Sequence, residues 1–238
     1  MIVIPMAGKS SRFFKAGFDK PKHQLTLNDQ YVFDLAVESF AEFFKTELFL
    51  FILQDTYQTL EFVEQRIKAL GIEQALIHVL DNDTMGQAHT VYLGIDNPDI
   101  DDEEPLFIFN IDTFHHNFIK PDFVDQVDGY LEVFKGEGDH WSFVAIDADG
   151  VVTHTAEKER ISEYCSNGLY YFKSKKLFMQ MFDDAVKQKL MVKGEYYIAP
   201  MYNLLIKQGC LIRQSLVELE AMSFCGTPDE YYHLLNNE

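Results

Sequence analysis

The chain alternates short apolar runs, each long enough for one strand, with segments whose apolar residues recur at helical spacing. Strand-like runs cover 2–6, 48–53, 75–80 and 105–111, and helical patterns cover 32–44, 57–70 and 86–94. Gly71 is expected to end the second helix. Strands that are apolar on both faces and alternate with amphipathic helices are typical of a parallel sheet covered by helices. The sequence therefore predicts an α/β fold, Rossmann-like, with three layers (α/β/α) and a mostly parallel, mixed sheet.

The second half of the chain is less regular. Strands are expected over 141–146, 151–155, 169–172 and 211–217, and helices over 175–188 and 197–207. No repeat, low-complexity tract or Pro/Ser-rich linker interrupts the sequence. We therefore expect one continuous domain over residues 1–238.

The charge balance restricts the partners of the chain. There are 20 Lys and Arg residues against 38 Asp and Glu, a net charge of −18. Such a field repels nucleic acid and anionic membrane surfaces, so neither is an expected partner. No apolar run approaches the roughly 20 residues that a membrane helix needs, and the first residues do not resemble a signal peptide. The three cysteines lack metal-site spacing and are interpreted as reduced thiols of a cytoplasmic protein.

One stretch departs from this acidic background. Residues 4–22, "IPMAGKSSRFFKAGFDKPK", contain no acidic residue before Asp19 and carry five cations: Lys9, Arg12, Lys15, Lys20 and Lys22. Small residues follow the first strand, so backbone N–H groups in this loop can approach a phosphate closely. The loop is not a Walker P-loop, because Val3 stands where that motif needs glycine. It is not a dinucleotide fingerprint either, because Ser10 and Phe13 replace the second and third glycines.

The stretch "VIPMAGKSSRF…GFDKPKHQL" resembles the signature of nucleotidylyltransferases that act on sugar 1-phosphates, G-x-G-x-R followed by P-K. Ser10 stands where the second glycine is usual, and it restricts positive φ. The resemblance implies that Arg12 holds the departing pyrophosphate and that Lys22 reaches the phosphates at the reacting centre. It also implies that the loop wraps the triphosphate, through Met6, Ala7, Gly8, Lys9, Ser10 and Ser11.

A second segment, "TMGQAHTV", is similar to the part of the family that recognises the base, and it implies nucleotide contacts for Gly86 and Gln87. Five residues earlier, where uridylyl and thymidylyl transferases commonly place glutamine, this chain has Asp81. A carboxylate only accepts hydrogen bonds, so it favours a base edge that presents an N–H donor. The sequence thus leans toward CTP or GTP.

"FIFNIDTF" ends an apolar strand shortly before Asp112. Ligands of open parallel sheets bind beyond the carboxyl ends of the strands, and Mg²⁺ takes one or two carboxylates with phosphate oxygens. Asp112 is therefore the predicted Mg²⁺ ligand, although a strand-end aspartate also commonly caps a turn. "FCGTPDEYY" resembles the closing D-x-G-T segment of the family, but Phe224 stands at its usual second metal-binding aspartate. Three alternatives follow. Asp112 and the nucleotide hold the metal ion alone, or Glu218 or Glu220 supplies a second carboxylate, or catalysis is impaired.

Two later segments of the chain resemble the part of the family that binds the acceptor, the sugar phosphate. "AEKERISEYCSNGLYYFKS" and "KGEYYIAPMYNLLI" resemble the segments that hold the sugar phosphate. By this resemblance Lys158 meets the acceptor phosphate, and Glu157 and Glu195 accept bonds from sugar hydroxyls. The acceptor-binding set is Glu157, Lys158, Asn167, Gly168 and Glu195.

Together these segments imply an enzyme of EC 2.7.7 type, which joins a nucleoside triphosphate to a sugar 1-phosphate and releases pyrophosphate. Residues 1–115 would form the nucleotide-binding half and residues 116–238 the acceptor-binding half. Family members commonly serve capsular or other surface-polysaccharide synthesis, and a homo-oligomer is possible. Two alternatives stay open: a metal-dependent glycosyltransferase of related GT-A architecture, and a catalytically silent nucleotide-binding homologue. The glycosyltransferases favour a D-x-D pair, where this chain has Asn110-Ile111-Asp112.

Overall fold

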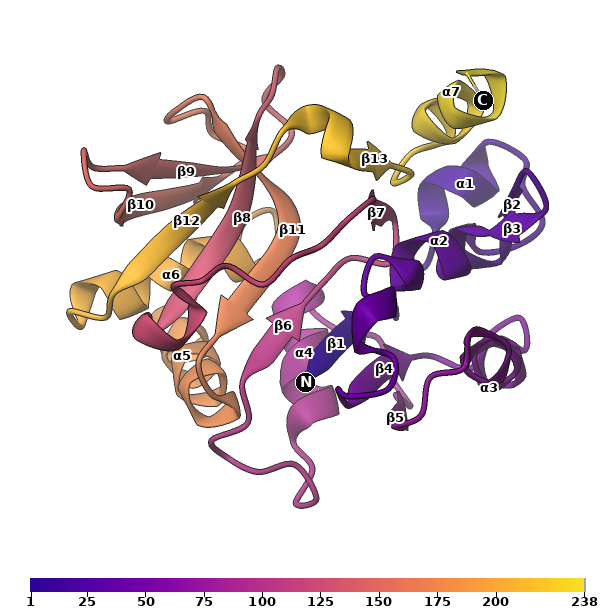
Figure 1. The fold of residues 1–238 in the computed structure, drawn as a ribbon, viewed down its shortest axis with the longest axis horizontal. Helices are drawn as coiled ribbons and strands as arrows, with labels where there is room; N and C mark the ends of the chain where they lie inside the picture. The colour runs from indigo at the N-terminus through magenta and orange to yellow at the C-terminus, as the bar shows by residue number, and fades with distance from the viewer. Residues whose placement is uncertain (238) are drawn as a thin grey trace. The chain divides into compact units, whose positions relative to one another are not determined.

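The computed structural model describes residues 1–237, which form two compact units (Figure 1). Unit 1 contains Met1, Asp83–Ile108 and Lys120–Leu219. Unit 2 contains Ile2–Asn82, Phe109–Ile119 and the chain from Glu220 onward. Each unit is thus assembled from separate segments of the sequence, whereas the expected halves, 1–115 and 116–238, were continuous.

Unit 2 is built on three parallel strands. Strand β1 pairs with β4 in the register Ile2↔Phe49, and β4 pairs with β5 in the register Phe49↔Ala75. Its strands are β1 (Ile2–Pro5), β2 (Thr26–Leu27), β3 (Gln30–Tyr31), β4 (Phe49–Leu53), β5 (Ala75–Val79), β7 (Thr113–His115) and β13 (Met222–Phe224). Its helices are α1 (Ser11–Lys15), α2 (Val32–Glu38), α3 (Thr59–Leu70) and α7 (Pro228–Asn237), with short 3₁₀ turns at Lys22–Gln24 and Ala41–Phe43.

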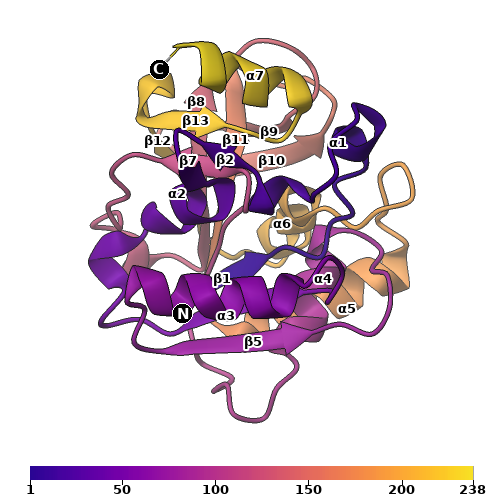
Figure 2. The same ribbon diagram turned by 90° about the vertical axis from the view of Figure 1, so that its right-hand side faces the viewer.

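Aromatic side chains fasten the helices of unit 2 to its strands. Phe33 of α2 packs between Phe51 of β4 and Phe62 of α3, with ring centroids 5.4 and 5.7 Å away. In Figure 2, α3 runs lengthwise beside β5. Helix α3 ends at Gly71, whose φ of 73° is left-handed, a common way for a helix to end. The parallel strands therefore have a rigid backing of helices, and the loops beyond their carboxyl ends are held in place.

Unit 1 has mixed pairing. Strand β11 runs antiparallel to β6, β8 and β9, whereas β12 runs parallel to β8. Its strands are β6 (Leu106–Ile108), β8 (Gly129–Lys135), β9 (Ser142–Ile146), β10 (Val152–Glu157), β11 (Tyr164–Phe172) and β12 (Ile212–Leu216). Its helices are α4 (Gln87–Ile95), α5 (Lys175–Gln188) and α6 (Ile198–Lys207), with 3₁₀ turns at Val124–Gln126 and, at its end, Leu219–Ala221.

The core of unit 1 lies between these strands and helices α5 and α6. Tyr202 of α6 is fully buried, and its ring stacks on Phe172 of β11 at 4.7 Å. Its hydroxyl donates to the carbonyls of Tyr130 and Tyr171, at 3.1 and 2.8 Å, so the polar end of the side chain is satisfied inside the core. Helix α6 is thus fixed to two strands at once.

The predicted fold class, α/β with a mixed and mostly parallel sheet, is confirmed. Most predicted elements occur within two residues of their expected bounds, and α5 spans the expected 175–188. The run 105–111 gives only a short strand, β6, after which the Phe109 N–H still donates to the Val3 carbonyl at 3.0 Å within unit 2. Strands β2, β3, β7, β8 and β13 and helices α1 and α7 were not predicted. None of the helices among residues 1–237 is long and apolar enough to cross a membrane.

Candidate active site

The loop after β1 contains the predicted phosphate-binding residues of unit 2. Ser10 has φ 49° and ψ 31°, the left-handed conformation that the second glycine of the family signature would adopt easily. The Lys22 N–H donates to the Ser10 Oγ at 3.1 Å, which ties the loop to the Pro21-Lys22 segment. A methyl group on the Cα of Gly8 would meet no atom within 4 Å, so the backbone there faces open space. Ser10 therefore makes the turn of the missing glycine and adds a bond that glycine cannot make.

Two of the predicted site residues of unit 2, Lys22 and Asp112, lie in contact. The Lys22 ammonium forms an ion pair with the Asp112 carboxylate, although the two residues are 90 positions apart in the chain. Both side chains are 20 % exposed, so the pair is partly screened by protein and still reachable from solvent. Lys22 lies on a 3₁₀ turn, and Asp112 immediately precedes β7. The structure thus brings together the predicted phosphate-contacting lysine and the predicted metal-binding carboxylate.

His23 anchors the turn that carries Lys22. Its ring is 4 % exposed and lies against Phe62 of α3, with centroids 6.0 Å apart. The Thr59 hydroxyl donates to the Thr56 carbonyl, so the His23 Nε2–H is the donor in the 3.4 Å contact with Thr59 Oγ1. Burial, with repulsion from Lys22, lowers the pKa of His23 to about 3. The imidazole is therefore a neutral, buried support for the neighbouring lysine.

The backbone of the closing segment holds Asp112 in place. The Cys225 N–H donates to the Asp112 carbonyl at 2.8 Å, and Phe224 pairs with Thr113 in the β13–β7 ladder. Burial, with the negative charge of Asp112, raises the pKa of the Cys225 thiol to about 12. Cys225 therefore stays a neutral thiol and packs behind the carboxylate.

Asp112 packs closely against the backbone of Gly226. A Cβ at position 226 would lie 2.9 Å from Asp112 Oδ2, closer than side-chain atoms normally approach, so glycine lets the carboxylate lie this near the closing segment. The Lys22 ammonium already places one positive charge on the same oxygen. Among residues 1–237 there is no cluster of three or more His, Cys, Asp or Glu side chains that could hold a metal alone. A single carboxylate of this kind suits Mg²⁺ only where most of the ligands come from phosphate oxygens.

The remaining predicted residues of unit 2 lie on its surface. Arg12 is exposed on α1, and its guanidinium makes no ion pair or hydrogen bond within the part of the chain that the structure describes. Asp81 is exposed two residues beyond the end of β5. Both side chains are therefore accessible to a ligand from solvent.

Gly86 in unit 1 is fixed by close backbone packing. Its φ is 106°, and a Cβ there would lie 2.7 and 2.8 Å from the carbonyl oxygen and nitrogen of Tyr196. The Tyr196 N–H donates to the Met85 carbonyl, and the Ala88 N–H donates to the Tyr196 carbonyl. Only glycine allows this approach, so position 86 joins the start of α4 to the segment before α6. Gln87 opens the helix.

Two predicted acceptor residues, Glu157 and Lys158, lie at the end of β10. The Lys158 Nζ donates to the Tyr197 hydroxyl at 2.6 Å, lies 4.4 Å from the centroid of that ring, and lies 3.5 Å from Glu157 Oε1. Partial burial acts to lower the pKa of Lys158, but the bond to Tyr197 and the charge of Glu157 raise it overall. Burial raises the pKa of Glu157, although the Ser142 hydroxyl donates to this carboxylate. The Lys158 ammonium therefore lies between the Tyr197 hydroxyl and the Glu157 carboxylate.

Two other acceptor candidates lie inside the sheet. Asn167 is 2 % exposed, and its Nδ2 donates to Glu132 Oε1 at 2.6 Å. Gly168, with φ 93°, lies where the β11–β8 register shifts between Ser166 and Tyr170. Such a bulge displaces the backbone locally. Asn167 therefore donates a hydrogen bond to a buried glutamate of its own sheet. Glu195 is exposed on a tight turn formed by Val192–Glu195 bonds.

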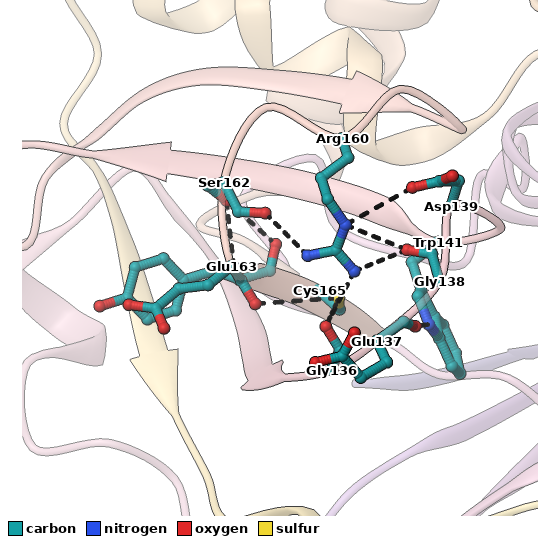
Figure 3. A network of polar contacts seen from close by, with 10 residues as sticks. Gly136, Glu137, Gly138, Asp139, Trp141, Arg160, Ser162, Glu163 and Cys165 are labelled. Carbon is teal, nitrogen blue, oxygen red and sulfur yellow. Dashed lines mark hydrogen bonds and ion pairs between the residues drawn. The ribbon is translucent and has the colours of Figure 1, made fainter.

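Arg160 organises the loop between β8 and β9 (Figure 3). Its guanidinium donates to the carbonyls of Gly136, Gly138 and Ser162 at 2.6 to 3.2 Å and lies 3.5 Å from Asp139. Its charge also lies over the Phe143 ring at 4.8 Å. These contacts hold the 136–141 loop against the start of β11, so we assign Arg160 to the framework of unit 1.

A cavity of about 260 Å³ lies in unit 2. Its lining comes from the β2–β3 hairpin, α2, β7, β13 and α7. Polar groups there bond to one another: the His115 N–H donates to Ser39 Oγ at 2.8 Å, and His116 Nε2 lies 3.1 Å from Ser223 Oγ. No residue expected to bind nucleotide, acceptor or metal lines this cavity.

Comparison with solved structures identifies the family. The chain is 45 % identical to the nucleoside-diphosphate-sugar pyrophosphorylase from Vibrio cholerae RC9, with 100 % of both chains covered and a TM-score of 0.95. The chain belongs to the nucleoside-diphosphate-sugar pyrophosphorylase family. It is accordingly an enzyme of the nucleotidyltransferase type, EC 2.7.7, as the sequence predicted.

More distant structures share the fold of this pyrophosphorylase. A glucose-1-phosphate thymidylyltransferase from Bacillus anthracis has 17 % identity and a TM-score of 0.72, with 99 % of this chain and 93 % of that chain covered. The inositol-1-phosphate CTP transferase from T. maritima has 15 % identity and a TM-score of 0.73, with 99 % and 94 % covered. A scan against protein-family models and a search of the curated proteins found no match.

The structure adds residues that sequence reasoning missed. His23 supports the Lys22 turn, Tyr197 pairs with Lys158, and Ser142 donates to Glu157. Of the residues suggested as replacements for the absent aspartate at position 224, Glu220 is exposed on a 3₁₀ turn and Glu218 is exposed at the end of unit 1.

Proposed function

We propose that this pyrophosphorylase joins a nucleoside triphosphate to a sugar 1-phosphate and releases pyrophosphate. The observation that carries the proposal is the meeting of Lys22 with Asp112, beside the small-residue loop tied to Lys22 through Ser10. The chain has a net charge of −18, but the basic loop of residues 4–22 places several positive charges near the Asp112 carboxylate. Such an arrangement suits polyanionic phosphates that the rest of the surface repels.

The reaction needs positioning and charge stabilisation more than proton transfer. The second pKa of a phosphate monoester is about 6, so near pH 7 the sugar 1-phosphate is largely dianionic and needs no general base. One of its oxygens attacks the α-phosphorus; the bond from that phosphorus to the bridging oxygen breaks, and pyrophosphate leaves with the electron pair. Catalysis of this kind relies on placing the two anions and offsetting the charge of the leaving group.

Different residues of unit 2 are assigned to charge stabilisation and to phosphate binding. Lys22 offsets negative charge on the reacting phosphates, and the exposed Arg12 offers a planar fork to pyrophosphate oxygens. Met6, Ala7, Gly8, Lys9, Ser10 and Ser11 provide the surrounding loop. Asp112 would hold Mg²⁺, which supplies charge neutralisation for the phosphates when bound.

The substrate assignments follow from donor and acceptor chemistry. Asp81 accepts hydrogen bonds only, so we assign the nucleotide to a base with an N–H edge, cytosine or guanine. Gly86 and Gln87 are assigned to the base segment. In unit 1, the Lys158 cation with Glu157 suits an anionic, hydroxyl-rich acceptor, and Glu195, Asn167 and Gly168 complete the proposed acceptor set. By family resemblance, we place the product in surface-polysaccharide synthesis in the cytoplasm.

The test is a pyrophosphate-release panel. Purified protein is incubated with each of the five common triphosphates, Mg²⁺ and a set of sugar 1-phosphates, and pyrophosphate is measured over time. We expect release only when triphosphate and acceptor are both present, with CTP or GTP preferred. Turnover of a nucleotide-sugar alone, by transfer of its sugar, would instead indicate a glycosyltransferase. Nucleotide binding without any release would indicate a silent homologue, a reading that Phe224 at the usual aspartate position favours.

A further inference from the structure

Tyr57 touches both of the segments that carry the predicted phosphate-binding cations of unit 2. Its ring stacks on Phe14, which follows Arg12 by two positions on α1, with ring centroids 5.1 Å apart and an interplanar angle of 22°. Its carbonyl accepts from Gln24 Nε2 at 3.1 Å, and Gln24 follows Lys22 by two positions. Strands β1 and β4 are parallel neighbours, so the loops that follow them leave the same edge of the sheet. One residue of the loop after β4 therefore joins the Arg12 segment to the Lys22 segment.

The loop that carries Tyr57 has an unusual backbone conformation. Tyr57 has φ 55° and Gln58 has φ 58°, so two neighbouring residues other than glycine are left-handed. Such a backbone costs free energy and persists only where the surrounding contacts maintain it. Gln24 Nε2 also donates to Thr59 Oγ1 at 3.4 Å, and Thr59 is 1 % exposed at the start of α3. The loop is thus anchored both to α3 and to the turn that carries Lys22.

The stack between Tyr57 and Phe14 lies at the surface of unit 2. Tyr57 is 57 % exposed and Phe14 is half-buried, whereas the neighbouring Phe13 is 1 % exposed. A largely exposed pair removes little apolar area from water, so it contributes little to the free energy of unfolding. The stack instead restrains a helix of only five residues, whose Arg12 makes no ion pair or hydrogen bond among residues 1–237. Its effect is therefore on the placement of Arg12.

We infer that Tyr57 is a positioning residue, which sets the separation of the Arg12 and Lys22 cations for the phosphates of the triphosphate. This role rests on the proposed function, because that function assigns both cations to phosphate binding. Pyrophosphate bridges two cations only when their separation matches its own length. Groups that are held in place before binding lose less freedom when the ligand arrives, and the affinity is higher as a result. Without the stack, the ligand itself would have to order α1 and Arg12.

The test measures the affinity of the full chain for pyrophosphate in the presence of Mg²⁺, by isothermal titration calorimetry. Tyr57→Ala removes the ring but keeps the carbonyl that accepts from Gln24, and Tyr57→Phe removes only the hydroxyl and keeps the stack. Tyr232→Ala is the matched control, because its ring is 48 % exposed and lies 5.7 Å from Phe18, away from α1. We expect at least about a 5-fold loss of pyrophosphate affinity in Tyr57→Ala, and less than about a 2-fold change in Tyr57→Phe and in Tyr232→Ala.

Two further readouts separate positioning from a general loss of stability. In a double-mutant cycle, adding Phe14→Ala to Tyr57→Ala should cause little further loss of pyrophosphate affinity, because the stack is already gone. In steady-state kinetics, Tyr57→Ala should raise the KM for triphosphate by about 5-fold and leave the KM for the acceptor within about 2-fold of wild type. Urea unfolding of Tyr57→Ala checks that this exposed substitution leaves the chain folded.

The outcomes distinguish the role of Tyr57 from the proposed function. Equal pyrophosphate affinity in wild type and Tyr57→Ala, with a clear loss in Lys22→Ala, overturns the role of Tyr57 and leaves the proposed function standing. The role is also overturned by fully additive losses in the cycle with Phe14, or by a loss in Tyr57→Phe as large as that in Tyr57→Ala. No pyrophosphate binding by the wild type, together with no pyrophosphate release, overturns both.

Discussion

The burial of neutral His23 makes the stability of this enzyme depend on pH in a defined window. The pKa of His23 is about 3 in the folded chain against 6.5 for the exposed side chain. Between these values the unfolded chain binds a proton that the folded chain does not. Stability is therefore complete above about pH 6.5 and falls as the pH is lowered, down to about pH 3.

The size of the effect follows from the two pKa values. Each unit of difference is worth about 1.4 kcal/mol, so acidification from pH 7 to pH 5 should remove about 2 kcal/mol of unfolding free energy through His23 alone. A loss of this size is a large part of the 5–15 kcal/mol typical of a folded domain. The Lys22 turn should loosen with it, because His23 fastens that turn to α3.

The assay is urea unfolding at pH 7, 6, 5.5 and 5, for wild type and His23→Gln. The glutamine stays neutral throughout, so the variant should lose about 2 kcal/mol less than the wild type over this range. Its stability at pH 7 is expected to be about 1 kcal/mol lower from altered packing. His154→Gln, on the exposed face of β10, is the matched control and should keep the wild-type slope. Equal slopes for wild type and His23→Gln would refute the reasoning.

Three further predictions follow from the site. Lys22→Ala and Arg12→Ala should each lower kcat/KM for pyrophosphate release by at least about 100-fold, with the far-UV spectrum unchanged, because each removes a charge that offsets the leaving group; near-normal turnover in either would remove its assigned role. Gly86→Ala should cost about 3 kcal/mol in urea unfolding, since its Cβ overlaps the Tyr196 backbone at 2.7 Å and its φ is 106°; a change below about 0.5 kcal/mol would show that this approach is not tight. Ser10→Gly should leave the unfolding free energy within about 0.5 kcal/mol of wild type, because relief of the left-handed conformation offsets the lost bond to Lys22. The KM for triphosphate should nonetheless rise, and an unchanged KM would count against the tie between Ser10 and Lys22.

Helices α3 and α5 were predictable because their ends carry local signals. Gly71 terminates α3 in a left-handed conformation, and α5 begins after Ser174, whose side chain accepts from the Leu177 N–H. Strand β8 escaped prediction because buried Glu132 interrupts its apolar pattern, and the Glu132 Oε1 accepts from Asn167, 35 positions away. A sequence pattern carries no information about such a long-range partner.

The phosphate-binding part of the site was predictable, because its residue types point to one kind of chemistry. The basic loop and Asp112 were selected by charge and by resemblance, and the structure joins Lys22 to Asp112 across 90 positions. Tyr197 was not selected, because its hydroxyl meets Lys158, 39 positions away, only in the folded chain.

The most direct test of the central assignment is the initial rate of pyrophosphate release by wild type and Asp112→Asn, measured side by side at equal concentrations of folded protein. Each reaction contains the preferred triphosphate, Mg²⁺ and the acceptor that supports turnover. Nucleotidyl transfer at the Lys22–Asp112 pair predicts release by the wild type that requires both substrates, and at least a 100-fold lower rate in the variant. Equal rates in the two proteins, or no release by the wild type with any substrate pair, would contradict it.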